Sequence, residues 1–81
     1  MAQCLISFFS THFALKAEEV LKDVGLKAHL IPVPRSISSS CTVALVFDAQ
    51  FKKEVFKNLT DSAVETESLY QQTEDGKWLT K

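Results

Sequence analysis

The sequence predicts an α+β domain in which two helices cover one face of an antiparallel sheet. Two observations carry this prediction. Short apolar segments typical of strands alternate with segments of helical spacing in the order β-α-β-β-α-β, and their lengths suit a two-layer sandwich. The chain is also 46% hydrophobic and 23% charged, as folded domains are. Its 81 residues supply one core, so we expect residues 1–81 to form a single domain.

The first strand and the first helix have clear signals. Cys4–Phe9 is an apolar run bounded by polar residues, which is typical of a strand buried on both faces. Ser10 or Thr11 can supply the N-cap of the helix, and Gly25 stands where the C′ residue belongs. The apolar face of this helix is expected to consist of Phe13, Ala17, Val20, Leu21 and Val24.

A second strand, a third strand and a second helix follow. Leu26–Ile31 is expected to be a strand that stops at Pro32, because proline cannot donate to a ladder. Cys41–Phe47 is nearly all apolar and is typical of a central, well-packed strand covered on one face. Asp48 is the expected cap of the second helix, whose inward side chains are Phe51, Val55, Phe56 and Leu59.

The C-terminal part predicts a strand and a hairpin. Val64–Gln71 alternates and is expected to be an edge strand that faces solvent. Asp75 and Gly76 are typical of a tight turn, after which Trp78 would fold back as a short strand or pack loosely. All six phenylalanines are expected in the core: Phe8, Phe9, Phe13, Phe47, Phe51 and Phe56.

This order of elements predicts a ferredoxin-like fold, with the first and third strands paired in the centre of the sheet. Antiparallel pairing would place Cys4 near Phe47 and Cys41 near Phe9, at opposite ends of the sheet. Five residues at about 3.3 Å each separate the two thiols by roughly 16 Å, beyond the roughly 7 Å Cα limit of a disulfide. We therefore expect no bridge between the two cysteines.

The same pairing predicts a site around Cys41. It would lie beside Ser10, Thr11 and His12 at the start of the first helix, where backbone amides and the positive dipole end stabilise a thiolate. His12 and Arg35 would tune its reactivity. The loop before it adds Pro32, Pro34, Ser38, Ser39 and Ser40. Alone, such a cysteine is more often a small buried residue; the stiff loop and its hydroxyls together favour a functional thiol.

Charge and motifs disfavour several classes of function. Nine basic and ten acidic residues, with scattered lysines, predict no nucleic-acid partner. No apolar run has the length of a membrane span and the N-terminus lacks a basic signal-peptide start, so a cytoplasmic protein without membrane contact is expected. No carboxylate pair, metal-ligand spacing or glycine-rich phosphate loop accompanies the thiol, so we expect no enzyme activity, metal or cofactor.

Two segments resemble a small bacterial family of selenium/sulfur carrier-like domains: STHFALKAEEVLK from Ser10 and PVPRSISSSC from Pro32. The resemblance runs over about Cys4–Tyr70. It implies a ferredoxin-like fold and a cysteine that carries sulfur or selenium. The matching positions are His12, Pro32, Pro34, Arg35, Ser38, Ser39, Ser40 and Cys41. The family pattern has glycine where this chain has Thr42, and a β-branched residue there would narrow access to the thiol or change its partner.

Three functions remain open from the sequence. In the first, Cys41 accepts sulfur or selenium from a donor enzyme such as a cysteine desulfurase and passes it to an acceptor protein. In the second, the Pro32–Cys41 loop is an anion- or ligand-binding module with a regulatory or interaction role, and the cysteine is merely small. In the third, the chain is a structural subunit that pairs through the edge strand Val64–Gln71.

Overall fold

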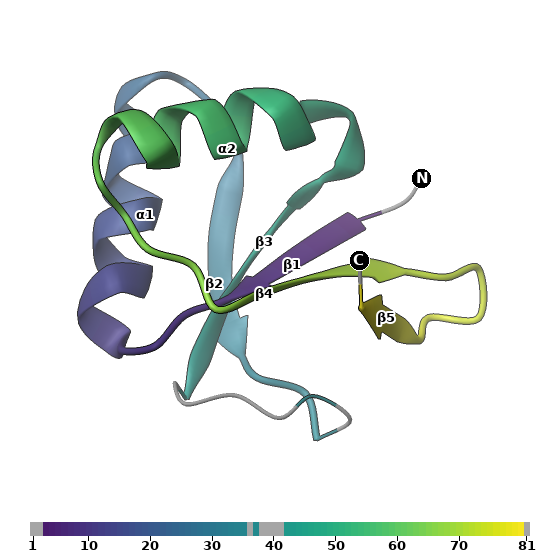
Figure 1. Cartoon of the computed structure of the whole chain (residues 1–81). Coiled ribbons are helices and arrows are strands. Elements are labelled where there is room, and N and C mark those ends of the chain that lie inside the picture. Colours follow the sequence, from purple (N-terminus) through teal and green to yellow (C-terminus); the bar gives the residue numbers. More distant parts are fainter. Residues whose placement is uncertain (1–2, 36, 38–41, 81) are drawn as a thin grey trace.

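The computed structural model describes residues 3–35, 37 and 42–80. It contains a five-stranded antiparallel sheet and two α-helices, and both helices lie over the same face of the sheet (Figure 1). The predicted α+β class is confirmed. The strands are β1 (Gln3–Ser7), β2 (Ala28–Pro32), β3 (Val43–Asp48), β4 (Ser68–Gln72) and β5 (Trp78–Thr80); the helices are α1 (Thr11–Asp23), the 3-10 turn η1 (Ala49–Phe51) and α2 (Lys52–Asp61).

The sheet has the strand order β2-β3-β1-β4-β5. β1 pairs with β3 and β4, and Cys4 lies opposite Phe47 as predicted. The arrangement is compatible with a ferredoxin-like fold, which β5 extends beyond β4. The prediction of Val64–Gln71 as an edge strand is wrong, because β4 begins only at Ser68 and pairs with β5 along its other side. The structural-subunit hypothesis therefore loses the free edge that it requires.

The hairpin between β4 and β5 was correctly predicted. The Gly76 N–H donates to the Thr73 carbonyl over 2.9 Å, and Gly76 has a φ of +83° that favours glycine. The chain then returns as β5, and Trp78 lies opposite Gln72. The short extra strand, one of the two outcomes expected for Trp78, is the one observed.

The main core lies between the helices and the sheet. Its buried members are Cys4, Ile6, Phe8, Ala14, Ala17, Leu21, Leu45, Phe47, Val55, Leu59 and Val64. Phe13, Phe51 and Phe56 are partly buried against this core. The prediction for Phe9 is wrong: its side chain is 53% exposed, because β1 ends at Ser7 and Phe9 lies in the connection to α1.

A second, smaller core lies on the opposite face of the sheet. Its buried members are Leu5, Ile37, Ala44 and Val46, and Ile31, Val33, Tyr70 and Trp78 pack around them partly buried. β3 was predicted to be covered on one face, but Leu45 and Phe47 contact the helix layer while Ala44 and Val46 belong to this second core. The near-continuous apolar run in β3 is therefore explained by burial on both faces.

Both helices end in the same backbone motif. After α1 the N–H groups of Gly25 and Leu26 donate to the carbonyls of Lys22 and Leu21, and Gly25 has a φ of +78°, as the sequence predicted. Val24 was expected on the apolar face but is 51% exposed, because it is the residue where the helix ends.

At the end of α2, Ala63 and Val64 donate to Thr60 and Leu59 in the same way, and Ala63 has a φ of +56°. An alanine therefore stands where α1 uses glycine. At the start, Asp48 was predicted to cap this helix directly. Its carboxylate instead accepts from the Gln50 N–H over 3.0 Å and caps η1, the turn that leads into α2.

Candidate functional site

The described residues of the predicted site lie at the end of the sheet where β1 and β2 finish and β3 begins (Figure 1). The Val33 N–H donates to the Thr42 carbonyl over 3.1 Å, which continues the pairing of β2 and β3 by one bond. This bond closes the base of the connecting loop. Thr42, the residue that directly follows Cys41 in the sequence, is exposed.

The loop begins with a tight turn. The Ile37 N–H donates to the Pro34 carbonyl over 3.0 Å, so Arg35 is the second residue of a four-residue turn, and its side chain is exposed. Ile37 is 7% exposed in the second core. The loop is thus anchored on the sheet face opposite the helices by an apolar side chain, besides the stiffness that its prolines provide.

The start of α1 carries the other predicted site residues. Ser10 is half-buried at the N-cap position, but its side chain makes no capping hydrogen bond, and the first turn contains no acidic residue. Thr11 and His12 are exposed. The His12 ring contacts the Phe13 ring edge-on, with centroids 5.9 Å apart. The positive end of the α1 helix dipole is therefore not neutralised by an acidic side chain of the same turn.

The structure brings Ser10, Thr11 and His12 together on one helix turn and places Arg35 in the turn of the neighbouring loop. Among the described residues no hydrogen bond, ion pair or ring contact links Arg35 to His12. The remaining predicted residues, Ser38, Ser39, Ser40 and Cys41, lie outside the described residues. Their convergence with the helix, and the absence of a bridge between the cysteines, stay predictions.

Cys4 lies in a different environment from the one the carrier chemistry needs. Its side chain is fully buried in the main core, and Cys4 pairs with Phe47 and Gln71 in the centre of the sheet. A partner protein cannot reach a thiol in that position without local unfolding. This agrees with the prediction that Cys4–Phe9 is a strand buried on both faces.

Sequence reasoning missed two residues near this end of the sheet. Ser7 is fully buried, and its hydroxyl has no hydrogen-bond partner within the described part of the chain. Ile37 anchors the loop. The signal for Ile37 was present, since it is an apolar residue in an otherwise polar run, whereas no local pattern marks Ser7.

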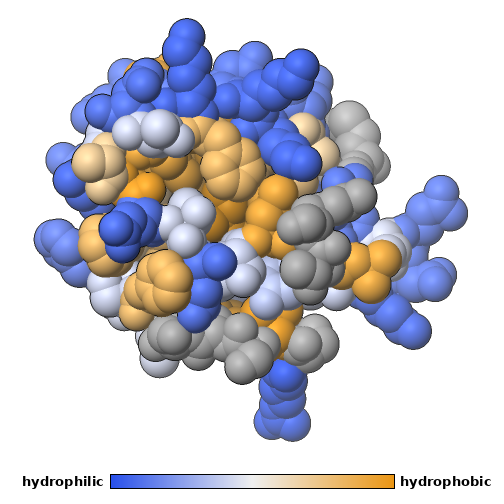
Figure 2. Space-filling view, in the orientation of Figure 1, coloured by the Kyte–Doolittle hydropathy of each residue, from blue (hydrophilic) through white to orange (hydrophobic). Residues whose placement is uncertain are grey.

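Apolar surface also extends onto the outside of the molecule. Figure 2 shows hydrophilic side chains over the outer side of α2, with an apolar area below that helix. On α1, Leu15 is 54% exposed and lines a surface groove together with His12, Lys16 and Glu19. His12 is therefore bordered by a groove with apolar and charged walls.

Two further findings concern function classes. Among the residues that the structure describes, no three His, Cys, Asp or Glu side chains lie where they could hold a metal ion together. Within the same ranges, neither helix has the length and apolar character needed to cross a membrane.

Comparison with known proteins identifies a family. A family model described as "Putative Se/S carrier protein-like" matches residues 3–71, which is most of the chain. The match includes β1 to β3, both helices, the loop between β2 and β3 and all of β4 except its last residue, and it ends before β5. No curated protein and no solved structure shows a significant match.

Proposed function

The chain belongs to this selenium/sulfur carrier-like family, and from that premise we propose that Cys41 carries a sulfur or selenium atom between a donor enzyme and an acceptor protein. We choose Cys41 over Cys4 because Cys4 is buried. The sequence contains two cysteines, and Cys4 is inaccessible in the core. We therefore assign the sulfur or selenium atom to Cys41, whose neighbour Thr42 is exposed.

The transfer is a thiol exchange. The Cys41 thiolate attacks the outer sulfur of a persulfide on the donor, a new sulfur–sulfur bond forms at Cys41, and the donor's own sulfur–sulfur bond breaks. The donor leaves as a thiolate, so no external oxidant or reductant is consumed. An acceptor thiolate then attacks the outer sulfur on Cys41 in the same way. A donor selenium atom would follow the same sequence of bonds.

The neighbouring elements supply the electrostatics for this step. The start of α1 carries partial positive charge and no acidic side chain in its first turn, and Arg35 and His12 are exposed at the same end of the domain. Positive charge near a thiol favours the thiolate, the reactive form. In the proposed mechanism the start of α1, Arg35 and His12 stabilise the negatively charged persulfide on Cys41, while the donor enzyme catalyses the release of sulfur.

Intact-mass measurement after incubation with a cysteine desulfurase and cysteine tests the proposal. We expect the wild-type protein to gain one sulfur atom, located at Cys41 by peptide mapping. Cys41→Ser should lose this gain completely. Cys4→Ala is the matched control, and it should keep the gain because the buried thiol takes no part. Wild-type protein that gains no sulfur, or a gain that persists in Cys41→Ser, would refute the proposal.

A second function is favoured by one observation, the start of α1 without a side-chain cap or an acidic residue. Such a helix start suits an anion, and the loop hydroxyls and Arg35 would complete the site. This module should bind inorganic phosphate equally well in wild-type protein and in Cys41→Ser, with no sulfur gained in either. Phosphate binding and gain of sulfur, both measured in wild-type protein and in Cys41→Ser, therefore distinguish the two functions.

A further inference from the structure

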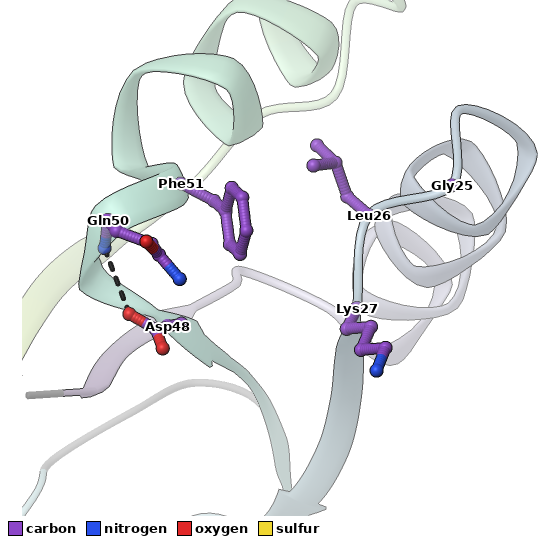
Figure 3. Close-up of a pocket in the computed structure, with 6 residues that line it drawn as sticks. All are labelled: Gly25, Leu26, Lys27, Asp48, Gln50 and Phe51. Carbon is purple, nitrogen blue, oxygen red and sulfur yellow. Dashed lines mark hydrogen bonds between the residues drawn. The ribbon is translucent and has the colours of Figure 1, made fainter. Parts of the chain in front are cut away.

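A pocket lies at the opposite end of the sheet from the loop that carries Cys41. It has a volume of about 410 Å³, within the roughly 300–1,000 Å³ typical of small-molecule sites. Two segments line it, the turn after α1 and the junction between β3 and α2 (Figure 3). Its lining residues are Gly25, Leu26, Lys27, Asp48, Gln50 and Phe51.

One wall of the pocket is apolar. Leu26 and Phe51 are partly buried against the main core, and Figure 3 shows the two side chains facing one another across the space. The exposed part of each can take up a further apolar group. Gly25 has no side chain beside them, and apart from Gly25 and its two chain neighbours no heavy atom of the described residues lies within 4 Å of the place where a Cβ would stand.

The rest of the lining is charged and polar. Lys27 is exposed on one side, and Asp48 lies half-buried on the other. Within the described part of the chain these two opposite charges form no ion pair with each other, and the Asp48 carboxylate accepts only from the Gln50 N–H. The Gln50 side-chain amide extends into the space between them (Figure 3). Figure 3 shows the ammonium of Lys27 and the carboxylate of Asp48 at the rim of the pocket, directed away from Leu26 and Phe51, so a ligand would meet both charges at that rim.

We propose that this pocket binds a free α-amino acid with an apolar side chain. The ligand's carboxylate pairs with Lys27, its ammonium pairs with Asp48, and its side chain packs between Leu26 and Phe51. An α-amino acid is the smallest class of metabolite that carries both charges and an apolar group together. The inference does not rest on the carrier function, because the pocket and the Cys41 loop are at opposite ends of β2 and β3.

Amide chemical shifts of the full-length protein report binding directly. L-Leucine is the probe, and it is compared with three molecules that each lack one feature: isocaproate lacks the ammonium, isoamylamine lacks the carboxylate, and glycine lacks the apolar side chain. We expect L-leucine to bind most tightly and to shift the amides of residues 25–27 and 48–51. No shift there up to the solubility limit of leucine, or equal binding of glycine, would overturn the proposal.

Two variants assign the charges. Lys27→Gln should weaken binding of L-leucine and isocaproate by about tenfold, the loss expected for a hydrogen bond to a charged group, and leave isoamylamine unchanged. Asp48→Asn should weaken L-leucine and isoamylamine similarly and leave isocaproate unchanged, while its oxygen still accepts from the Gln50 N–H.

Matched control variants lie on α2 outside the pocket. Lys53→Gln and Asp61→Asn remove the same charges from exposed positions and should bind all four probes as the wild type does. If Lys53→Gln lowers affinity as much as Lys27→Gln, net charge controls binding and the assigned contacts are wrong. If Lys27→Gln and Asp48→Asn each lower the affinity for isocaproate and for isoamylamine by the same factor, the proposed orientation of the ligand is wrong.

Discussion

Ser7 and Cys4 show how two small residues of the same strand reach opposite faces of the sheet. Cys4 belongs to the core beneath the helices, whereas alternation places Ser7 on the face of Leu5 and the second core. The Ser7 hydroxyl has no partner among the described residues, and a buried hydroxyl of this kind lowers stability because it has lost its hydrogen bonds to water. Such groups in native proteins need an explanation, and here a substitution can measure the cost.

Ser7→Ala should raise the free energy of unfolding by about 1 kcal/mol, since the variant no longer buries an unsatisfied hydroxyl. Equilibrium unfolding in urea, followed by circular dichroism, measures the change. Ser68→Ala is the matched control. It lies opposite Ser7 on β4 with a partly exposed side chain, and a change within about 0.5 kcal/mol is expected. A loss of stability in Ser7→Ala would mean that the hydroxyl has a partner.

The two helix ends form a natural comparison at the level of elements. Gly25 and Ala63 occupy the same position of the same motif with a positive φ, and only glycine adopts that conformation without cost. In both motifs the following residue, Leu26 or Val64, packs against the main core. The motif therefore fixes the direction in which the chain leaves each helix.

Exchanging the residue types should change stability in opposite directions. Gly25→Ala should cost about 1 kcal/mol, a purely conformational penalty, because no described heavy atom beyond the two chain neighbours lies within 4 Å of the new Cβ. Ala63→Gly should gain about 0.5 kcal/mol, because relief of the strained φ outweighs the added freedom of the unfolded chain. Urea unfolding midpoints at an unchanged denaturant slope test both. Equal signs for the two variants would contradict this account.

The same pair shows what the sequence can predict about elements. The end of α1 was predictable because glycine at this position indicates a positive φ. Asp48 correctly marked where the chain leaves β3 and becomes helical, because aspartate is a strong capping residue, although the turn that it caps is η1 and not α2. The end of α2 was not, because alanine carries no such signal. Val64 was therefore assigned to the following strand, although it completes the helix motif and is buried in the core.

At the scale of the whole molecule, the central pairing of β1 with β3 was predictable and the second core was not. The pairing follows from the order of elements, and the observed register of Cys4 with Phe47 agrees with it. The second core joins Ile37 of a loop to Trp78 of β5, residues far apart in sequence and outside any periodic run. Local periodicity reports burial within an element, so it cannot reveal contacts that loops make.

This limit also applies to the candidate site. The chain order predicts which loop and which helix start share one end of the sheet, and the described residues of both are found there. The pocket at the other end escaped prediction, because Lys27 and Asp48 are ordinary surface residues in sequence and share a cavity only through the fold. The two proposed sites thus lie at opposite ends of the sheet.

The second core predicts how much the domain depends on β5. The family match ends at residue 71, and β4 already completes the four-stranded part of the sheet. Removal of residues 74–81 should therefore leave a folded domain. It should be less stable by about 2 kcal/mol, because the chain loses Trp78, a large aromatic side chain that packs partly buried against the second core.

Far-UV circular dichroism during urea unfolding measures this loss, since the truncated chain lacks the one tryptophan of the sequence and cannot be followed by its fluorescence. Trp78→Ala in the full chain should lose nearly as much stability, because burial of that side chain accounts for most of the effect. Leu79→Ala is the matched control on the same strand, and its 55% exposed side chain should matter little. If the truncated chain fails to fold while Trp78→Ala stays near wild type, backbone pairing along β4 stabilises the domain instead, and the second core contributes little through its aromatic cover.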